Sequence, residues 1–187
     1  MPVQVDTQRY LDLVEDANAI VTFDIEASGL KADYNSTLVV SLKPFQDDPH
    51  TFTIQQFGND KKVVREAKEF LEKFDCWISY YGKGFDIKFL NTRLLKWGYE
   101  PIQPRHHLDM YYVLKHHTVM GRRSQESYLD FLGTEQKKMK VSQNVWSEMG
   151  FKMSEHMPVM IERCETDVIG LEQLYNKTRH LIGEIKK

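Results

Sequence analysis

Two carboxylates, Asp24 and Glu26, stand two residues apart in an otherwise largely apolar run, IVTFDIEASGL, that covers residues 20–30. If this run forms a strand, side chains alternate between its faces, so Thr22, Asp24 and Glu26 share one face. Neighbouring carboxylates on such a strand repel each other and lose hydration. A bound cation would remove both costs, whereas a solvated acidic face on an edge strand would explain the pair without any function.

Two further acids lie where a metal site could use them. Asp86 falls in the first turn of an expected helix, where the helix dipole by itself also favours an acid. Asp167 lies at helical spacing from Cys164 and Leu171, which places it on the expected inward face of the last helix. A buried acid in mid-helix is costly unless it is paired or binds a metal, and Arg163 is one possible partner.

The first half of the chain alternates between strand and helix patterns, which must position these acids. Three successive strands with short links predict an antiparallel meander, at about 19–26, 37–43 and 51–57. Apolar spacing then predicts helices at 61–74, 85–97 and 110–117. Between them it predicts a buried strand at 76–81 and a final strand at 106–109.

The second half is expected to be helical with loops. The pattern predicts a helix from about 124 to 133, a polar basic segment at 135–144 and a long helix at about 155–182. Together these elements predict an α/β fold with a mixed sheet of about five strands, first antiparallel and then parallel, flanked by helices. We expect a single domain over residues 1–187, with 1–18 as an N-terminal helical extension.

The composition is that of a soluble globular protein, with 41% hydrophobic and 28% charged residues. A net charge of -2 argues against a protein that coats nucleic acid through bulk charge, but it allows a local basic track. The two cysteines form no CxxC pair, so we expect buried, reduced thiols rather than zinc ligands or a disulfide. With no membrane-spanning run and no signal-peptide pattern, we expect a cytoplasmic protein without a membrane partner.

The segments FDIEASG, GKGFDIKFL and RCETDVIGLEQLY, in this order, resemble the three motifs of the DEDD superfamily of 3′–5′ exonucleases, which have a ribonuclease H-like fold. Asp24 and Glu26 match the first motif, Asp86 the second and Asp167 the third. The resemblance covers about residues 19–177, and three ordered motifs are fairly specific where each alone is weak. The last segment resembles in particular a ribonuclease H-like branch found near polymerase proofreading domains.

The resemblance implies a metal-dependent 3′–5′ exonuclease that hydrolyses DNA or RNA by a two-metal-ion mechanism. Two Mg²⁺ or Mn²⁺ ions would be held by Asp24, Glu26, Asp86 and Asp167, with Asp24 as the bridging ligand. The implied partner is single-stranded or 3′-ended nucleic acid, and a replication or repair polymerase is a further candidate. The alternatives are a structure-specific endonuclease of the same fold and a catalytically weak or silent nucleic-acid-binding module. The oligomeric state stays open.

The sequence departs from the family at the residue that positions the attacking water. Family members usually place a Tyr four residues, or a His five residues, before the last Asp, where this chain has Arg163 and Glu162. A lysine near two metal ions could have a lowered pKa and orient the water, and Lys140 is the candidate catalytic residue. Direct action of Glu162 and a weak or lost activity are the alternatives. The polar segment 135–156 holds the favoured substitutes: Lys138, Lys140 and His156.

Candidate substrate-binding residues surround the motifs. HLDMYYVLK is similar to a segment of the polymerase-associated branch, and its Asp109 is a candidate for supporting the site or contacting the substrate. A role as N-cap of the following helix explains Asp109 equally well. Basic residues would bind phosphates, and aromatic residues could stack on bases. The candidate set is Ser28, Gly29, Leu30, Phe85, Asp109, Arg122, Arg123 and Lys138.

Overall fold

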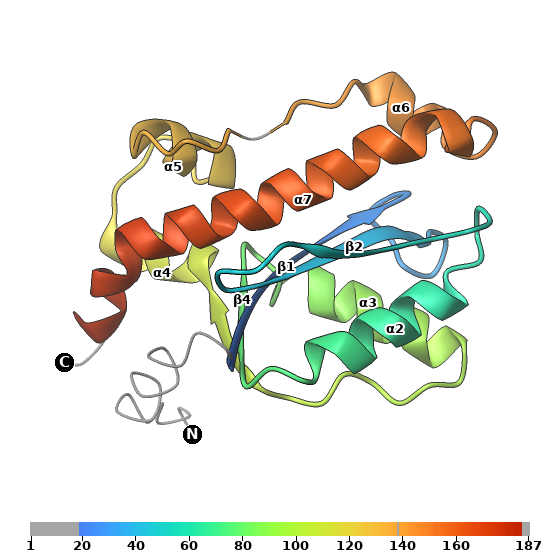
Figure 1. Ribbon diagram of the computed structural model, residues 1–187, viewed down its shortest axis with the longest axis horizontal. Helices are drawn as coiled ribbons and strands as arrows, with labels where there is room; N and C mark the ends of the chain where they lie inside the picture. Colours follow the sequence, from blue (N-terminus) through green and yellow to red (C-terminus); the bar gives the residue numbers. More distant parts are fainter. Residues whose placement is uncertain (1–18, 138, 185–187) are drawn as a thin grey trace.

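The computed structural model describes residues 19–137 and 139–184, and the expected helical extension at 1–18 lies outside them. A five-stranded sheet in the order β3-β2-β1-β4-β5 forms the centre (Figure 1). Its strands are β1 (Ile20–Ala27), β2 (Thr37–Pro44), β3 (His50–Thr53), β4 (Cys76–Ser79) and β5 (His106–Asp109). The first three pair antiparallel, and β4 and β5 run parallel to β1, which confirms the predicted mixed sheet.

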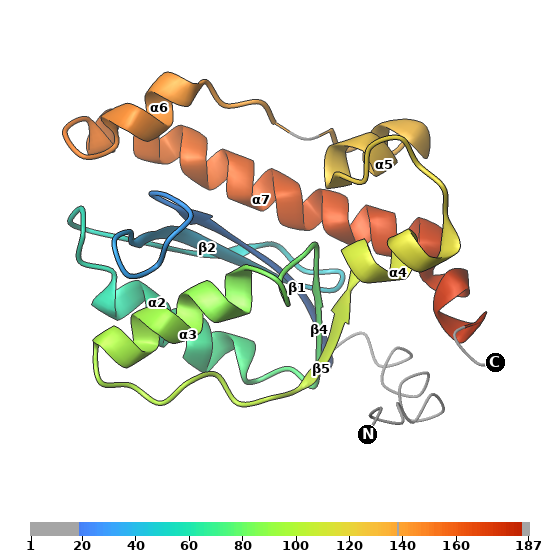
Figure 2. The same ribbon diagram turned by 180° about the vertical axis from the view of Figure 1, so that it is seen from behind.

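Helices cover both faces of this sheet (Figures 1 and 2). On one face lie α2 (Lys61–Leu71) and α3 (Asp86–Lys96), and α7 (Met153–Thr178) crosses the other. The remaining helices lie around the ends of α7: α4 (Met110–His117), α5 (Gln125–Phe131), α6 (Gln143–Glu148) and a 3₁₀ helix (Arg179–Glu184). None of the helices in the described part of the chain combines the length and apolar character that crossing a membrane requires.

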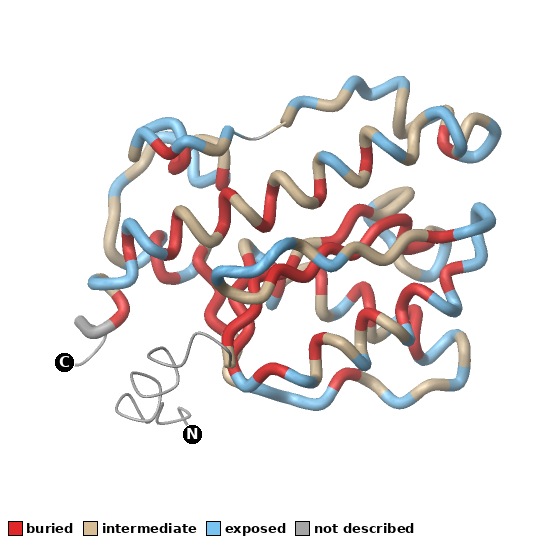
Figure 3. Tube along the Cα trace, in the orientation of Figure 1, coloured by how far each residue is buried: buried red, intermediate tan, exposed pale blue. Residues whose placement is uncertain are grey.

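The alternation of side chains along β1 sets which residues reach which layer. Val21, Phe23 and Ile25 are buried in the core that the sheet shares with α2 and α3. On the other face, the Thr22 hydroxyl donates to the backbone oxygen of Val168 in α7, at 3.2 Å. The predicted division of β1 is therefore confirmed, and its acidic face is turned toward α7. Figure 3 shows the buried residues concentrated in the sheet and in the helix sides that face it.

Several elements differ from the expected boundaries, since α2 ends at Leu71 instead of 74 and β4 at Ser79 instead of 81. β3 ends at Thr53 instead of Phe57, because the chain turns through an isolated bridge between Gln56 and Asn59. A short helix that was not expected, α6, lies within residues 135–156. The last helix begins at Met153 and ends at Thr178, and the chain then tightens into the 3₁₀ helix. Gly98 ends α3 as expected, with a φ of 74° that favours glycine.

Both cysteines are buried free thiols, as predicted. Burial raises the pKa of Cys76 to about 12, and the neighbouring Asp75 carboxylate adds to this effect. Burial also raises the pKa of Cys164 well above its usual value. Both side chains therefore stay protonated at neutral pH and pack as small apolar groups.

Candidate functional site

Three carboxylates meet between the sheet and α7. Asp24 and Glu26 come from β1 and Asp167 from α7, and one oxygen of each lies within 4.8 Å of the others. Glu26 and Asp167 are buried, with exposed fractions of 6% and 1%. Carboxylate oxygens gathered in this way are hard ligands of the kind that Mg²⁺ and Mn²⁺ prefer. We call Asp24, Glu26 and Asp167 the acidic cluster.

Contacts on two sides of α7 fix the position of Asp167 opposite β1. Toward the sheet, the Cys164 thiol contacts the backbone oxygen of Asp24 at 3.4 Å. Away from the sheet, the Gln125 side-chain amide donates to the Asp167 backbone oxygen at 2.7 Å. Gly170 allows this close approach of α5, since a Cβ there would lie 2.9 Å from the Leu129 side chain. These contacts hold α7 between β1 and α5 at the position of Asp167.

Asp86 adds a fourth carboxyl next to the cluster. It opens α3, is only 5% exposed and follows the loop at 80–85. Burial raises the pKa of Asp86 to about 7, against backbone hydrogen bonds from Asp86 itself and Ile25, and the carboxylates of Asp109 and Glu26 raise it further. Near neutral pH this group is therefore divided between its neutral and charged forms, and a nearby cation would favour the charged form.

Asp109 holds the loop that delivers Asp86. Its carboxylate accepts hydrogen bonds from the backbone amides of Tyr81 at 2.8 Å and Lys83 at 3.0 Å. It also caps α4 by accepting from the Tyr111 amide at 3.1 Å. Burial raises the pKa of Asp109, while these backbone hydrogen bonds oppose the rise. The Asp109 carboxylate thus makes both contacts that the sequence suggested, since it supports the loop before Asp86 and also caps α4.

A second contact fixes the start of the same loop. The Ser79 hydroxyl lies 2.6 Å from the imidazole of His107 and accepts a hydrogen bond from the Gly82 amide at 3.2 Å. A Cβ at position 82 would lie 2.4 Å from the same oxygen, so only glycine fits there. Burial lowers the pKa of His107 to about 3, which keeps this imidazole neutral at physiological pH.

Arg163 reaches the acidic cluster from α7. Its Nε donates to a Glu26 carboxylate oxygen at 2.5 Å, and Nη1 donates to the backbone oxygen of Met139 at 3.0 Å. Its guanidinium also lies 5.6 Å from the centre of the Trp146 ring in α6. Burial works against its charge, but the carboxylates of the acidic cluster outweigh burial and raise the pKa of Arg163. Helical spacing suggested Asp167 as the partner of Arg163, and the contact with Glu26 was not expected.

The structure places the expected water-positioning substitutes outside the acidic cluster, as far as it describes them. Lys140 is 86% exposed and lies 3.4 Å from a Glu126 carboxylate oxygen. His156 lies 3.0 Å from Glu148, and Glu162 is exposed. Lys138 lies outside the described residues. The group that lies at the cluster is instead Arg163.

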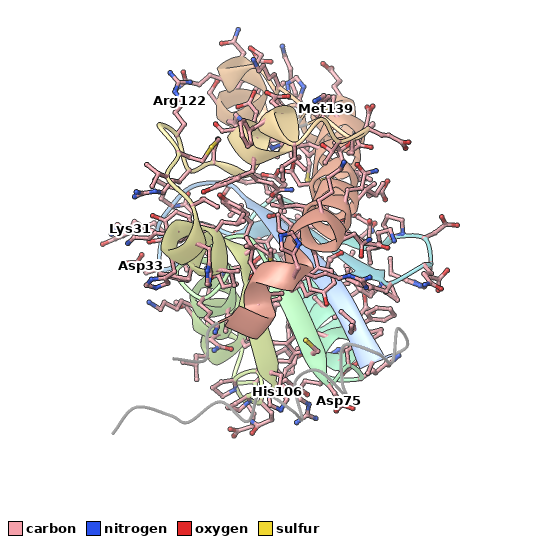
Figure 4. All side chains as sticks on the ribbon, turned by 90° about the vertical axis from the view of Figure 1, so that its left-hand side faces the viewer. Lys31, Asp33, Asp75, His106, Arg122 and Met139 are labelled. Carbon is pink, nitrogen blue, oxygen red and sulfur yellow. The ribbon has the colours of Figure 1, made fainter. Side chains whose placement is uncertain are left out.

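The remaining candidates lie in the loop after β1, in a cavity beside it and beyond α4. Ser28 and Gly29 close the loop at 28–36, where the Ser28 hydroxyl accepts from the Ser36 amide at 3.0 Å. Leu30, which is 80% exposed, lines a cavity of about 200 Å³ together with Phe85. Arg122 and Arg123 are exposed beyond α4. Figure 4 places Lys31 and Arg122 along one edge of the molecule.

Comparison with known proteins gives a family and a fold. Residues 21–179 match the RNase_H_2 family, described as RNase_H superfamily. Among curated proteins, none matches the sequence significantly. The structure is similar to that of the family B DNA polymerase from the hyperthermophilic archaeon Pyrobaculum calidifontis, with a TM-score of 0.67 and 17% identity. This match covers 86% of the chain but 24% of that polymerase, and at this identity it concerns the fold alone.

Proposed function

This chain belongs to the RNase H superfamily, and from this membership we propose that it is a metal-dependent 3′–5′ exonuclease that hydrolyses phosphodiester bonds of DNA or RNA. The observation that carries the proposal is the acidic cluster, whose ligand atoms lie within 4.8 Å of one another. Its members belong to the first and third segments that resemble DEDD motifs. The fold similarity to a DNA polymerase supports a nucleic-acid-processing context, and a polymerase partner remains a prediction.

The donor set fits the ions that this function needs. Asp24, Glu26, Asp86 and Asp167 would hold two Mg²⁺ or Mn²⁺ ions, which when bound activate a water and stabilise the leaving oxygen. Asp109 keeps the loop before Asp86 in place through two backbone amides. The cavity lined by Leu30 and Phe85 offers apolar side chains to the terminal base, and exposed arginines beyond α4 offer contacts to phosphates.

A metal-dependent exonuclease assay with a ligand variant tests this proposal. We expect 5′-labelled single strands to give a ladder that shortens from the 3′ end in Mg²⁺ or Mn²⁺ and no products in EDTA. Asp24→Asn should lower the rate by at least about 100-fold, more than loss of a supporting residue around a metal commonly costs. Unchanged degradation by Asp24→Asn would assign the activity to a contaminant, and cleavage of circular single strands would indicate an endonuclease.

The Arg163–Glu26 pair favours one alternative function, a nucleic-acid-binding module without catalysis. Arg163 stands where members of the DEDD superfamily usually carry the tyrosine that positions the attacking water. Because its guanidinium already compensates Glu26, it competes with any cation for that carboxylate. If a metal ion cannot displace Arg163 from Glu26, the protein would bind nucleic acid without cleaving it. If the metal ion displaces Arg163, the protein would be an enzyme with weakened metal affinity.

Arg163→Gln tests through metal binding whether the arginine competes with the metal. We expect the variant to bind Mn²⁺ about tenfold more tightly than the wild type, because Glu26 loses a competing positive charge. Isothermal titration calorimetry with Mn²⁺ measures this change without any substrate. Lys137→Gln is the matched control, since it removes a positive charge from an exposed pair with Asp130. Weaker Mn²⁺ binding by Arg163→Gln would show that the arginine supports the ligands instead of competing with the metal.

A further inference from the structure

Three tyrosine rings gather on the surface beside the loop that carries Asp86. Tyr81 comes from this loop, and Tyr111 and Tyr112 come from the first turn of α4. The Tyr81 ring centre lies 5.0 Å from that of Tyr111 and 6.1 Å from that of Tyr112, and the last two lie 5.2 Å apart. Tyr81 is 45% exposed and Tyr112 37% exposed. We call these three residues the tyrosine platform.

The backbone of Tyr81 has an unusual conformation for an exposed aromatic residue. Its φ is 66°, in the left-handed region that bulky side chains rarely adopt. Such strain persists only where the surroundings hold it, and here the Asp109 carboxylate accepts from the Tyr81 amide at 2.8 Å. Gly84 lies under the ring, since a Cβ there would come within 2.5 Å of it. Core packing does not explain this conformation, because almost half of the side chain faces solvent.

Basic residues belong to the segments that form or adjoin the tyrosine platform. Lys83 and Lys115 are exposed, and the Lys115 ammonium lies 5.9 Å from the centre of the Tyr111 ring. The Tyr80 hydroxyl donates to the backbone oxygen of Arg123 at 2.6 Å, and the Tyr80 ring lies 6.0 Å from that of Tyr111. The segment with Arg122 and Arg123, which we call the arginine turn, is therefore attached through Arg123 to the same surface. Exposed aromatic rings among basic side chains are the combination with which proteins bind single-stranded nucleic acid.

We propose that the tyrosine platform stacks unpaired bases of single-stranded DNA or RNA, at a distance from the bond that is cut. Asp109 accepts from two backbone amides of the loop before Asp86, one of them that of Tyr81, so the platform borders the segment that leads to a proposed metal ligand. The lysines and the arginine turn would contact the phosphates of the same strand. This inference rests on the proposed function and adds to it a binding surface for nucleotides that do not react.

Oligonucleotide binding without cleavage tests the tyrosine platform. Fluorescence anisotropy in EDTA with a labelled single strand of about twelve nucleotides should show Tyr81→Ala and Tyr112→Ala binding about 5- to 100-fold more weakly than the wild type. Tyr112→Phe should bind like the wild type, because the ring is kept. Phe151→Ala is the matched control, since Phe151 is 74% exposed and lies outside the platform. Circular dichroism checks that each variant is folded.

Substrate length separates the failure of this inference from the failure of the proposed function. In Mg²⁺ or Mn²⁺, Tyr112→Ala should raise KM for the long strand and leave cleavage of a dinucleotide unchanged. If Tyr81→Ala and Tyr112→Ala bind and cleave the strand as the wild type does, the platform is overturned and the exonuclease proposal stands. A wild type that binds the strand through the platform without cleaving it would overturn the exonuclease only. No binding of the strand by the wild type would overturn the platform.

Discussion

Asp86→Asn is expected to stabilise the metal-free protein at pH 8 and, in the presence of metal, to abolish most of the proposed nuclease activity. The carboxyl is buried beside Glu26 and Asp109, and burial first, then these two carboxylates, raise its pKa to about 7. An unfolded aspartate has a pKa of about 3.9. Between these values the folded protein keeps a proton that the unfolded chain has lost, so stability falls as the pH rises from about 4 to about 7.

Above pH 7 the wild type therefore carries a buried charge that the asparagine variant lacks. At about 1.4 kcal/mol per unit of pKa, the difference between the folded and unfolded pKa of Asp86 corresponds to about 2–4 kcal/mol in the free energy of unfolding. The nuclease rate should fall by more than about 100-fold, because the variant loses one proposed metal ligand. The same carboxylate thus destabilises the fold and serves the proposed reaction.

Urea unfolding in EDTA at pH 5 and pH 8 measures the effect of Asp86→Asn on stability. The wild type should lose stability between these two pH values by more than the variant does. Asp75→Asn serves as the control, because this aspartate is exposed at the start of β4. An Asp86→Asn variant that is less stable than the wild type at pH 8 would contradict the assignment of Asp86 as a costly buried charge.

Arg93→Met is expected to destabilise the protein by about 3–5 kcal/mol, because it leaves a buried aspartate without its cation. Arg93 and Asp60 are 1% and 0% exposed, and two guanidinium nitrogens donate to the carboxylate at 2.8 and 2.9 Å. Burial would raise the pKa of Asp60, but hydrogen bonds from Arg93, Trp97 and the Thr37 amide hold it below its usual value. The network also reaches the loop at 28–36, where Arg93 donates to the Ala32 oxygen at 2.9 Å.

The double variant Arg93→Met with Asp60→Asn should be more stable than Arg93→Met alone, since the uncompensated charge is gone. Arg65→Met in α2 is the matched control, because its pair with Glu69 is exposed and should contribute about 0.5 kcal/mol or less. Denaturant unfolding of the four proteins gives the comparison. Equal effects of Arg93→Met and Arg65→Met would show that the buried pair contributes no more than a surface pair.

The acids of the site could be predicted because each lies in a repeating pattern. Period-two alternation in β1 placed Asp24 and Glu26 on one face, and helical spacing placed Asp167 on the inward side of α7. Both placements depend on neighbours within a few residues, and the structure confirms both. The mixed sheet followed in the same way from the order and length of the strands.

Contacts between distant segments could not be predicted in this way. The sequence shows no reason for Arg163 to choose Glu26, 137 positions earlier, over its near neighbour Asp167. The Asp60–Arg93 pair joins two helices and was equally invisible. α6 was missed because a six-residue helix is too short to show a period, although its Trp146 packs near the Arg163 guanidinium.

The acidic cluster joins parts of the chain that are synthesised far apart in time. Cys164 and Asp24, whose contact helps to seat α7 on β1, are separated by 140 positions. Contacts over such separations form late in folding, because the chain must first close a long loop. A partly folded or nascent chain can therefore build the sheet before it gathers the three carboxylates. On this order of events, the proposed nuclease activity would arise only when folding is nearly complete, so an incompletely folded chain would not cleave nucleic acid.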